Sequence, residues 1–170
     1  MRSIKRIINI HQIEGYKVYC LFNNGESRII DFQQLFQDWG VGRGDIEFPL
    51  LTSQEEFSQV EVIDGTLVWR NLPIESENDL GEREIYYYDL DPIVLYEASL
   101  PDPLRKLEIG LMIKQARKEQ GLTQEELASK SGTSKHYISR VENNKSGIEL
   151  STLIKIVEGG LGKRLQINIG

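Results

Sequence analysis

The sequence has little of several residue types, and each shortage excludes a class of protein. It has one cysteine, Cys20, so no disulfide forms within the chain, and a lone thiol in an apolar run is typical of a buried residue in a reducing compartment. The two histidines, His11 and His136, lie far apart with no cysteine near either, so the spacing of a zinc site is absent. We therefore expect no metal and no cofactor.

Long apolar runs are also missing. No segment approaches the ~18 uninterrupted apolar residues of a membrane helix, and no apolar run of a signal peptide follows Arg2, Lys5 and Arg6. We therefore expect a cytoplasmic protein with no membrane partner. The composition, 39% apolar and 27% charged, suits a packed core, and 170 residues suit one large domain or two small ones.

Basic residues are scarce overall, but their distribution is uneven. The net charge of −6 disfavours a nucleic-acid partner, because phosphates repel an acidic protein. Up to Asp102 the chain has 8 basic and 19 acidic residues, a net charge of −11, and from Pro103 onward it has 12 and 7, a net charge of +5. This change of sign predicts two modules. We assign an acidic domain to residues 1–98, a proline-containing linker to 99–103 and a second domain to 104–170.

The first module is predicted to be an α+β domain with two hairpins and short helices. Strands are expected at 6–10, 16–22 and 27–32, with the turn at Asn24-Gly25, where both residues tolerate positive φ. A second hairpin joins 60–63 to 67–69 through Asp64-Gly65. The polar stretch 75–84 is expected to be an exposed loop, followed by an edge strand at 85–88.

Three short helices complete this prediction. Residues 32–39 place Phe32, Leu35, Phe36 and Trp39 on one face. Residues 53–57 open with a capping box of Ser53 and Glu56, and residues 92–98 follow an Asp91 N-cap with proline in the first turn. This order of elements resembles a small bacterial α+β domain family of unknown function over residues 3–98, chiefly through Val68-Trp69 and the closing segment 91–97.

Catalytic signals in this module are weak. The glycine-rich segment 40–45 lacks the Gly-Lys-Ser/Thr ending of a P-loop and is interpreted as a flexible connection. The pairs Asp89/Asp91 and Glu55/Glu56 suit acid–base chemistry or a metal, but they also lie at predicted helix starts, where the helix dipole favours acids. The run 86–88 of three tyrosines is either an interaction edge or an ordinary strand. No nucleophile with its base is visible, so we expect no enzyme.

The second module is predicted to be helical. Helices are expected at 104–120, 124–130, 134–142 and 150–158, from apolar residues at helical spacing. Gly121 ends the first, Thr123 and Glu126 form a capping box for the second, and Gly132 lies in the turn before the third.

The motifs 122–128 (LTQEELA), 131–134 (SGTS) and 137–145 (YISRVENNK) resemble the phage-repressor (Cro/C1, or XRE-type) helix-turn-helix family. One departure is Asn144, where glycine is more usual, although asparagine also tolerates positive φ. The resemblance implies that the third helix reads bases in the major groove through Ser134, Lys135, His136, Ser139 and Arg140. It implies that Thr123, Gln124, Lys145 and Ser146 hold the phosphates.

The end of the chain is predicted to be a dimerisation strand. After a glycine-rich break at 159–162, residues 163–169 alternate polar with apolar residues, the latter being Leu165, Ile167 and Ile169. Such a strand must pair with the first module or with a second copy. In antitoxin-type regulators of the family a tail of this kind pairs across a dimer axis, which implies a homodimer on half-sites ~34 Å apart.

These observations favour a sequence-specific DNA-binding transcriptional repressor that binds an operator in double-stranded DNA. The antitoxin-type resemblance and the charge asymmetry further suggest the antitoxin of a toxin–antitoxin pair, with the acidic domain bound to a basic toxin protein. Two alternatives stay open. The first domain is a sensor for a small ligand, or it is an enzyme module delivered to DNA.

Overall fold

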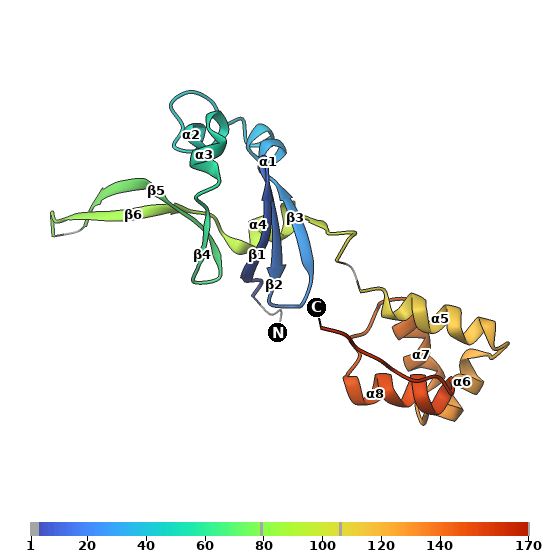
Figure 1. Ribbon diagram of the computed structural model, residues 1–170. Helices are drawn as coiled ribbons and strands as arrows, with labels where there is room; N and C mark the ends of the chain where they lie inside the picture. Colours follow the sequence, from blue (N-terminus) through green and yellow to red (C-terminus); the bar gives the residue numbers. More distant parts are fainter. Residues whose placement is uncertain (1–3, 79, 106, 170) are drawn as a thin grey trace. The chain divides into compact units, whose positions relative to one another are not determined.

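The computed structural model describes residues 4–78, 80–105 and 107–169 (Figure 1). The chain divides into two compact units, Met1–Lys106 and Leu107–Gly170, each with its own hydrophobic core. This division comes later than the predicted linker at 99–103, because a short strand, β7 (Leu100–Pro101), belongs to a sheet of the first unit. The predicted end of the first domain at residue 98 is therefore too early.

The first sheet of this unit is antiparallel and has the order β1-β2-β3-β7. Its longer strands are β1 (Ile7–Glu14), β2 (Lys17–Phe22) and β3 (Ser27–Asp31), which confirms the three predicted strands. At the turn between β2 and β3 only Gly25 has positive φ, at 81°. The predicted hairpin is confirmed, and Gly25 alone supplies the left-handed residue that its turn needs.

The second sheet contains a hairpin much longer than predicted. Its strands are β4 (Glu61–Ile63), β5 (Thr66–Glu77) and β6 (Arg83–Asp89), in the order β4-β5-β6. The turn after β4 matches the prediction, since Asp64 and Gly65 both have positive φ. The predicted loop at 75–84 is wrong, because β5 and β6 stay paired up to Glu77 and Arg83. Asn78 closes the hairpin: its side-chain oxygen accepts hydrogen bonds from the N–H groups of residues 80 and 82.

Four short helices accompany these sheets: α1 (Phe32–Asp38), α2 (Phe48–Thr52), α3 (Gln54–Phe57) and α4 (Pro92–Ala98). The predicted cap of α4 is confirmed, since the Asp91 carboxylate accepts from the N–H of Ile93 at 2.7 Å. Ser53 caps α3 as predicted, but the Glu56 carboxylate accepts from the side chain of Asn71. Trp39 directly follows α1, and its ring lies 5.9 Å from that of Phe36, although Trp39 is exposed while Phe32, Leu35 and Phe36 are buried.

The core of the first unit is built around aromatic side chains. The ring of Phe32 lies 5.2 Å from that of Phe57 and 5.3 Å from that of Trp69, both with tilted, edge-type geometry. The Trp69 indole donates a 2.8 Å hydrogen bond to the carbonyl of Phe57, so its polar edge is satisfied inside the core. Cys20 is fully buried in this core, and burial raises the pKa of its thiol to about 12. This finding agrees with its interpretation as a small apolar residue.

The second unit is helical. Its elements are α5 (Ile109–Glu119), α6 (Gln124–Ser131), α7 (Lys135–Glu142), α8 (Leu150–Ile154) and a π-helical turn, η1 (Lys155–Gly160). The start predicted for its first helix, residue 104, is wrong because Asp102 is held by the first sheet. The Asp102 N–H donates to the carbonyl of Ser27, and its carboxylate accepts from the Ser27 hydroxyl.

The last helix extends through the predicted glycine break. Gly160 is buried against α6, where an added Cβ would lie 2.6 Å from a methyl carbon of Leu127. The wider π-helical turn brings Ile156, fully buried, into the core. Residues 163–169 are not in a strand in the single chain, so the dimerisation strand stays a prediction. Among the residues described, no helix is long and apolar enough to cross a bilayer.

Candidate nucleic-acid interface

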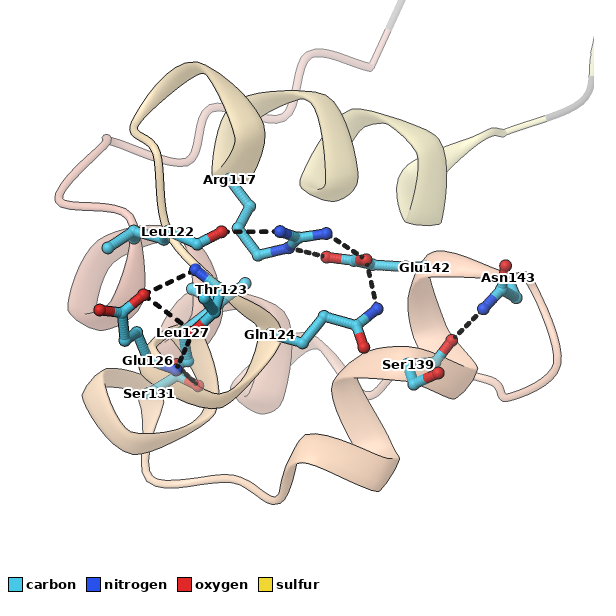
Figure 2. A network of polar contacts seen from close by, with 10 residues as sticks. All are labelled: Arg117, Leu122, Thr123, Gln124, Glu126, Leu127, Ser131, Ser139, Glu142 and Asn143. Carbon is cyan, nitrogen blue, oxygen red and sulfur yellow. Dashed lines mark hydrogen bonds and ion pairs between the residues drawn. The ribbon is translucent and has the colours of Figure 1, made fainter.

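Helices α6 and α7 are joined by a tight turn whose ends are capped from within. The Thr123 hydroxyl accepts from the N–H of Glu126 at 3.1 Å, and the Glu126 carboxylate accepts from the N–H of Thr123 at 2.7 Å (Figure 2). This is the predicted capping box. Gly132 ends α6 in the left-handed conformation, with φ at 64°, and the Ser134 hydroxyl caps α7. The turn geometry therefore follows from residues that the sequence identifies.

A buried ion pair links α5 to the end of α7. Arg117 donates to both carboxylate oxygens of Glu142, at 2.6 and 2.9 Å, and to the carbonyl of Leu122 at 2.7 Å (Figure 2). Gln124, the first residue of α6, donates to the same carboxylate at 2.8 Å. The network therefore fixes the start of α6 relative to α7. The network was not predictable from the sequence, since nothing in the local pattern distinguishes Arg117 and Glu142 from solvated charges.

The electrostatics of this pair favour its charged form. Burial raises the pKa of Glu142, but hydrogen bonds from Arg117 and Gln124, together with the charge of Arg117, outweigh burial and hold the pKa below its ordinary value. The hydrogen bond to Glu142 raises the pKa of Arg117. Both groups are therefore ionised at neutral pH, as a two-pronged guanidinium–carboxylate pair requires.

Helix α7 buries one face and exposes the other. Ile138 and Val141 lie in the core, whereas Lys135, His136 and Arg140 are exposed. Ser139 is half-buried, and its carbonyl accepts from the side chain of Asn143 (Figure 2). The exposed face therefore carries the polar side chains that the resemblance assigns to base reading: Ser134, Lys135, His136, Ser139 and Arg140.

The first turn of α6 and the loop after α7, which carry the predicted phosphate contacts, lie next to this face. An ion pair of 3.3 Å between Lys135 and Glu125 joins the first turns of α7 and α6. The guanidinium of Arg140 donates to the carbonyl of Lys145 at 3.1 Å, which places the following loop beside α7. Asn144 in that loop has φ at 54°, as its tolerance of positive φ predicts.

The residues of the predicted phosphate contacts differ in the hydrogen bonds that they make within the chain. The Thr123 hydroxyl is bound to Glu126 and the Gln124 amide to Glu142, so both side chains serve the fold. Ser146 is half-buried and donates to the neighbouring carbonyl of Gly147, while Lys145 is exposed. The contacts of these four residues with phosphate stay a prediction, and the positive N-terminal end of α6 is part of it.

The predicted dimerisation residues lie along the C-terminal tail. Leu165 is half-buried against the core of the second unit, whereas Ile167 is 61% exposed and Ile169 is 96% exposed. With Met112 and Val157, Leu165 lines a groove of about 320 Å³ between α5 and the tail. The apolar face of the tail is therefore only partly covered within one chain.

Two of the four acids considered for catalysis have structural roles in the first unit, and the other two are exposed. Asp91 is the cap of α4, and Asp89 is exposed at the end of β6. Glu56 accepts from Asn71, and Glu55 is exposed on the surface of α3. Over the described parts of the chain, no three histidine, cysteine or acidic side chains lie close enough to hold a metal ion.

Comparison with known proteins identifies the second unit. Residues 113–159 match the family model for the helix-turn-helix, HTH_3. The second unit is a helix-turn-helix domain of the XRE type. A comparison with curated proteins gives no match.

Solved structures similar to the chain include restriction-modification regulators. The wild-type controller protein C.Esp1396I is 37% identical, with 34% of this chain and 74% of that chain covered and a TM-score of 0.32. A point mutant of the same controller is 35% identical, with 34% of this chain and 73% of that chain covered and a TM-score of 0.33. The protein NE0471 from Nitrosomonas europaea, described as DNA-binding, is 12% identical over 89% of this chain and 84% of its own, with a TM-score of 0.38.

Proposed function

We propose that this protein is a transcriptional repressor that binds a double-stranded DNA operator in a sequence-specific manner through its helix-turn-helix domain. The observation that carries the proposal is the exposed polar face of α7, where Lys135, His136 and Arg140 project from a helix held by a buried ion pair. The second unit has 10 basic and 7 acidic residues, a net charge of +3, so its local field attracts phosphates.

In this proposal α7 lies in the major groove and presents its first turn to the base edges. Lys135 and Arg140 donate to guanine O6 and N7, and His136, Ser134 and Ser139 add shorter contacts. The N-terminal end of α6 and the loop containing Lys145 and Ser146 bind the backbone phosphates and set the register. The Arg117–Glu142 pair contributes indirectly, by keeping α6 and α7 at a fixed distance.

A pair of substitutions tests the two roles separately. Arg140→Ala is expected to relax the preferred sequence, at a cost of about 1–3 kcal/mol on the best site, in a selection from DNA with a randomised centre. Lys145→Ala is expected to weaken all sequences alike and to reduce the slope of log K against log salt by about one. Lys155→Ala, which removes an exposed charge from η1, is the matched control. Equal salt slopes for the wild type and Lys145→Ala would contradict the phosphate role.

We also propose that the protein acts as a homodimer through its C-terminal tail. Two tails paired antiparallel would bring Leu165, Ile167 and Ile169 of each copy onto one face of a small ribbon. Deleting residues 163–170 is expected to give a monomer in light scattering and to weaken binding to two-half-site DNA. A truncated protein that stays dimeric would contradict this proposal.

For the cellular role, we propose an antitoxin whose acidic unit binds a basic toxin protein. The support is the charge of the first unit, which has 10 basic and 19 acidic residues, a net charge of −9. The experiment is to express the reading frame next to this gene alone and with this protein. Growth arrest that this protein relieves is the expected result, and a neighbour without any effect on growth would contradict the antitoxin role.

A cleft in the first unit favours a second candidate function, a ligand-sensing repressor. The cleft has a volume of about 590 Å³, and Leu35, Leu100 and Pro101 give it apolar walls, with Lys17 and Asp31 at its rim. A small molecule bound there would contact β7, which leads toward the second unit. The melting temperature of the first unit is measured by tryptophan fluorescence, with and without candidate compounds. A compound that raises this temperature and also changes DNA affinity would favour the sensor over the antitoxin.

A further inference from the structure

The outer part of the β5–β6 hairpin is a two-stranded ribbon, which we call the arm and define as residues 73–77 and 83–87. Its strands pair with each other from Pro73 opposite Tyr87 to Glu77 opposite Arg83. Over the described residues, no third strand pairs with it. In Figure 1 the arm runs away from the other elements of the first unit. Both of its backbone edges are therefore open.

A register break separates the arm from the core. On one side Trp69 pairs with Tyr88, and both are buried. The next pair is Pro73 with Tyr87, so three residues of β5 have no partner on β6. Among the hydrophobic residues of the arm, Ile74 packs against the core of the unit, whereas Ile85, Tyr86 and Tyr87 are exposed. A two-stranded ribbon with so little packing is only marginally stable in water. Binding of a partner along the arm would therefore stabilise it.

The side chains of the arm are unusual for a solvent-exposed hairpin. Ile85, Tyr86 and Tyr87 are 62%, 52% and 44% exposed, although large apolar and aromatic residues are ordinarily buried. Cross-strand partners share one face of a ribbon, so Tyr87 and Ile85 lie with Pro73 and Glu75 on the same face. Exposed tyrosines beside open strand edges are typical of protein interfaces.

The charge of the arm selects the kind of partner. Together with the turn that joins its strands, the arm spans residues 73–87, which contain five acidic residues and one basic residue, Arg83, a net charge of −4. DNA and anionic lipid are disfavoured by repulsion, and so is the arm of a second copy, which carries the same charge. A basic protein surface is complementary to the arm in both charge and apolar character.

We propose that the arm is a docking surface for a basic protein. Ile85 and Tyr87 form its apolar centre, Glu75 and Glu77 its charged rim, and the open edge of β6 accepts a strand or extended segment of the partner. This inference rests on the proposed binding of a basic partner by the acidic unit, and it assigns that binding to particular residues. It also gives the tyrosine run a role that the core does not require, except at the buried Tyr88.

The first step of the test identifies the occupant. A photo-cross-linking amino acid is placed at position 85 in the full chain, expressed in the native cell, and at position 38 on α1 as a control. The expected result is one adduct, specific to position 85, with a protein of basic isoelectric point. No adduct at position 85, or an adduct only with nucleic acid, an acidic protein or a second copy of this chain, overturns the proposal.

The second step measures the purified partner by calorimetry. The double variants Ile85→Ser/Tyr87→Ser and Glu75→Gln/Glu77→Gln are each expected to weaken binding about tenfold or more. Glu55→Gln/Glu97→Gln changes the same charge at exposed positions outside the arm, and its expected change is below about twofold. Equal weakening by the arm and control variants overturns the proposal.

Two controls separate the possible failures. Unchanged Trp69 fluorescence shows that an arm variant is folded, because Trp69 is buried next to Tyr88 at the base of the arm. DNA affinity is measured on the same proteins. It is expected to stay unchanged in Ile85→Ser/Tyr87→Ser and to rise modestly, and alike, in Glu75→Gln/Glu77→Gln and Glu55→Gln/Glu97→Gln, because each of these removes two negative charges from the first unit. Lost DNA binding in the wild type would contradict the proposed repressor, whereas intact DNA binding without partner binding would contradict the arm.

Discussion

At the residue scale, Arg117 and Glu142 carry more of the fold than their sequence context indicates. The Glu142 side chain is fully buried and that of Arg117 nearly so. Removing one partner leaves the other charge buried without compensation, so Arg117→Met is expected to destabilise the second unit by about 3–5 kcal/mol. Replacing both residues with apolar ones is expected to restore most of that loss.

The measurement uses the distribution of tryptophan. Both tryptophans, Trp39 and Trp69, lie in the first unit, so their fluorescence follows its unfolding alone. Far-UV circular dichroism follows both units, and a urea transition seen only by dichroism belongs to the second. If Arg117→Met leaves the urea midpoint of the second unit unchanged, the ion pair contributes nothing to the stability of that unit.

The same pair predicts how the second unit responds to acid. Since folding lowers the pKa of Glu142, its charge adds stability above the unfolded value of about 4.3. That contribution disappears as pH falls below this value and through the lower pKa of the folded state. We expect the Glu142→Gln protein to be less stable than the wild type near neutral pH. Between about pH 5 and pH 3, its free energy of unfolding should fall by less than that of the wild type. Glu149→Gln, at an exposed position, is the control, and parallel curves for wild type and Glu142→Gln would contradict the prediction.

At the element scale, Gly110 decides how α5 packs. Its Cα faces α7, where an added Cβ would lie 2.1 Å from the carbonyl oxygen of Val141. Alanine is favoured over glycine within a helix by about 1 kcal/mol, but a contact this short with backbone forces the two helices apart. Gly110→Ala is therefore expected to unfold the second unit, so that its urea transition in circular dichroism and its DNA binding are both lost. Tryptophan fluorescence, which reports the first unit, should stay unchanged. Gly147→Ala, which has open space around it, is the control; equal melting of the two variants would contradict the packing argument.

What the sequence predicted well at this scale depends on neighbours in the chain. The capping box of α6, the Asp91 cap of α4 and the Asp64-Gly65 turn each need only residues within about four positions, and all three are confirmed. Elements set by distant contacts were missed. Strand β7 exists because it pairs with β3, some 70 residues earlier. The length of the β5–β6 hairpin was missed for another reason: residues 75–84 are polar enough to be interpreted as a loop, although 85–88 were predicted to be an edge strand.

The candidate site divides in the same way. Helical spacing predicts that Ile138 and Val141 point inward, and hence that the polar face of α7 is exposed. The partner of Gln124 was not predictable, because Glu142 reaches it only after the two helices pack. The sequence therefore predicts which face of α7 meets DNA, while the support behind that face had to come from the structure.

At the scale of the whole molecule, opposite charges on the two units govern DNA affinity. The first unit carries −9 and the second +3, so the acidic unit repels the duplex to which the basic unit is proposed to bind. A protein that begins at residue 107 is expected to bind DNA more tightly than the full chain. The gain should be largest near 50 mM salt and should shrink toward 300 mM, because the Debye length falls from roughly 14 Å to about 6 Å.

The cut belongs after residue 106, since β7 and the buried Asp102 complete the first sheet, and the second unit has its own core. The control is the full chain with its arm acids neutralised, Glu75→Gln/Glu77→Gln, which lowers the charge of the first unit without removing it. A smaller gain with the same salt dependence identifies repulsion as the cause. Affinities that are equal at every salt concentration would instead mean that the first unit is held far enough from the duplex for its charge to be screened, so that its role lies in what else it binds.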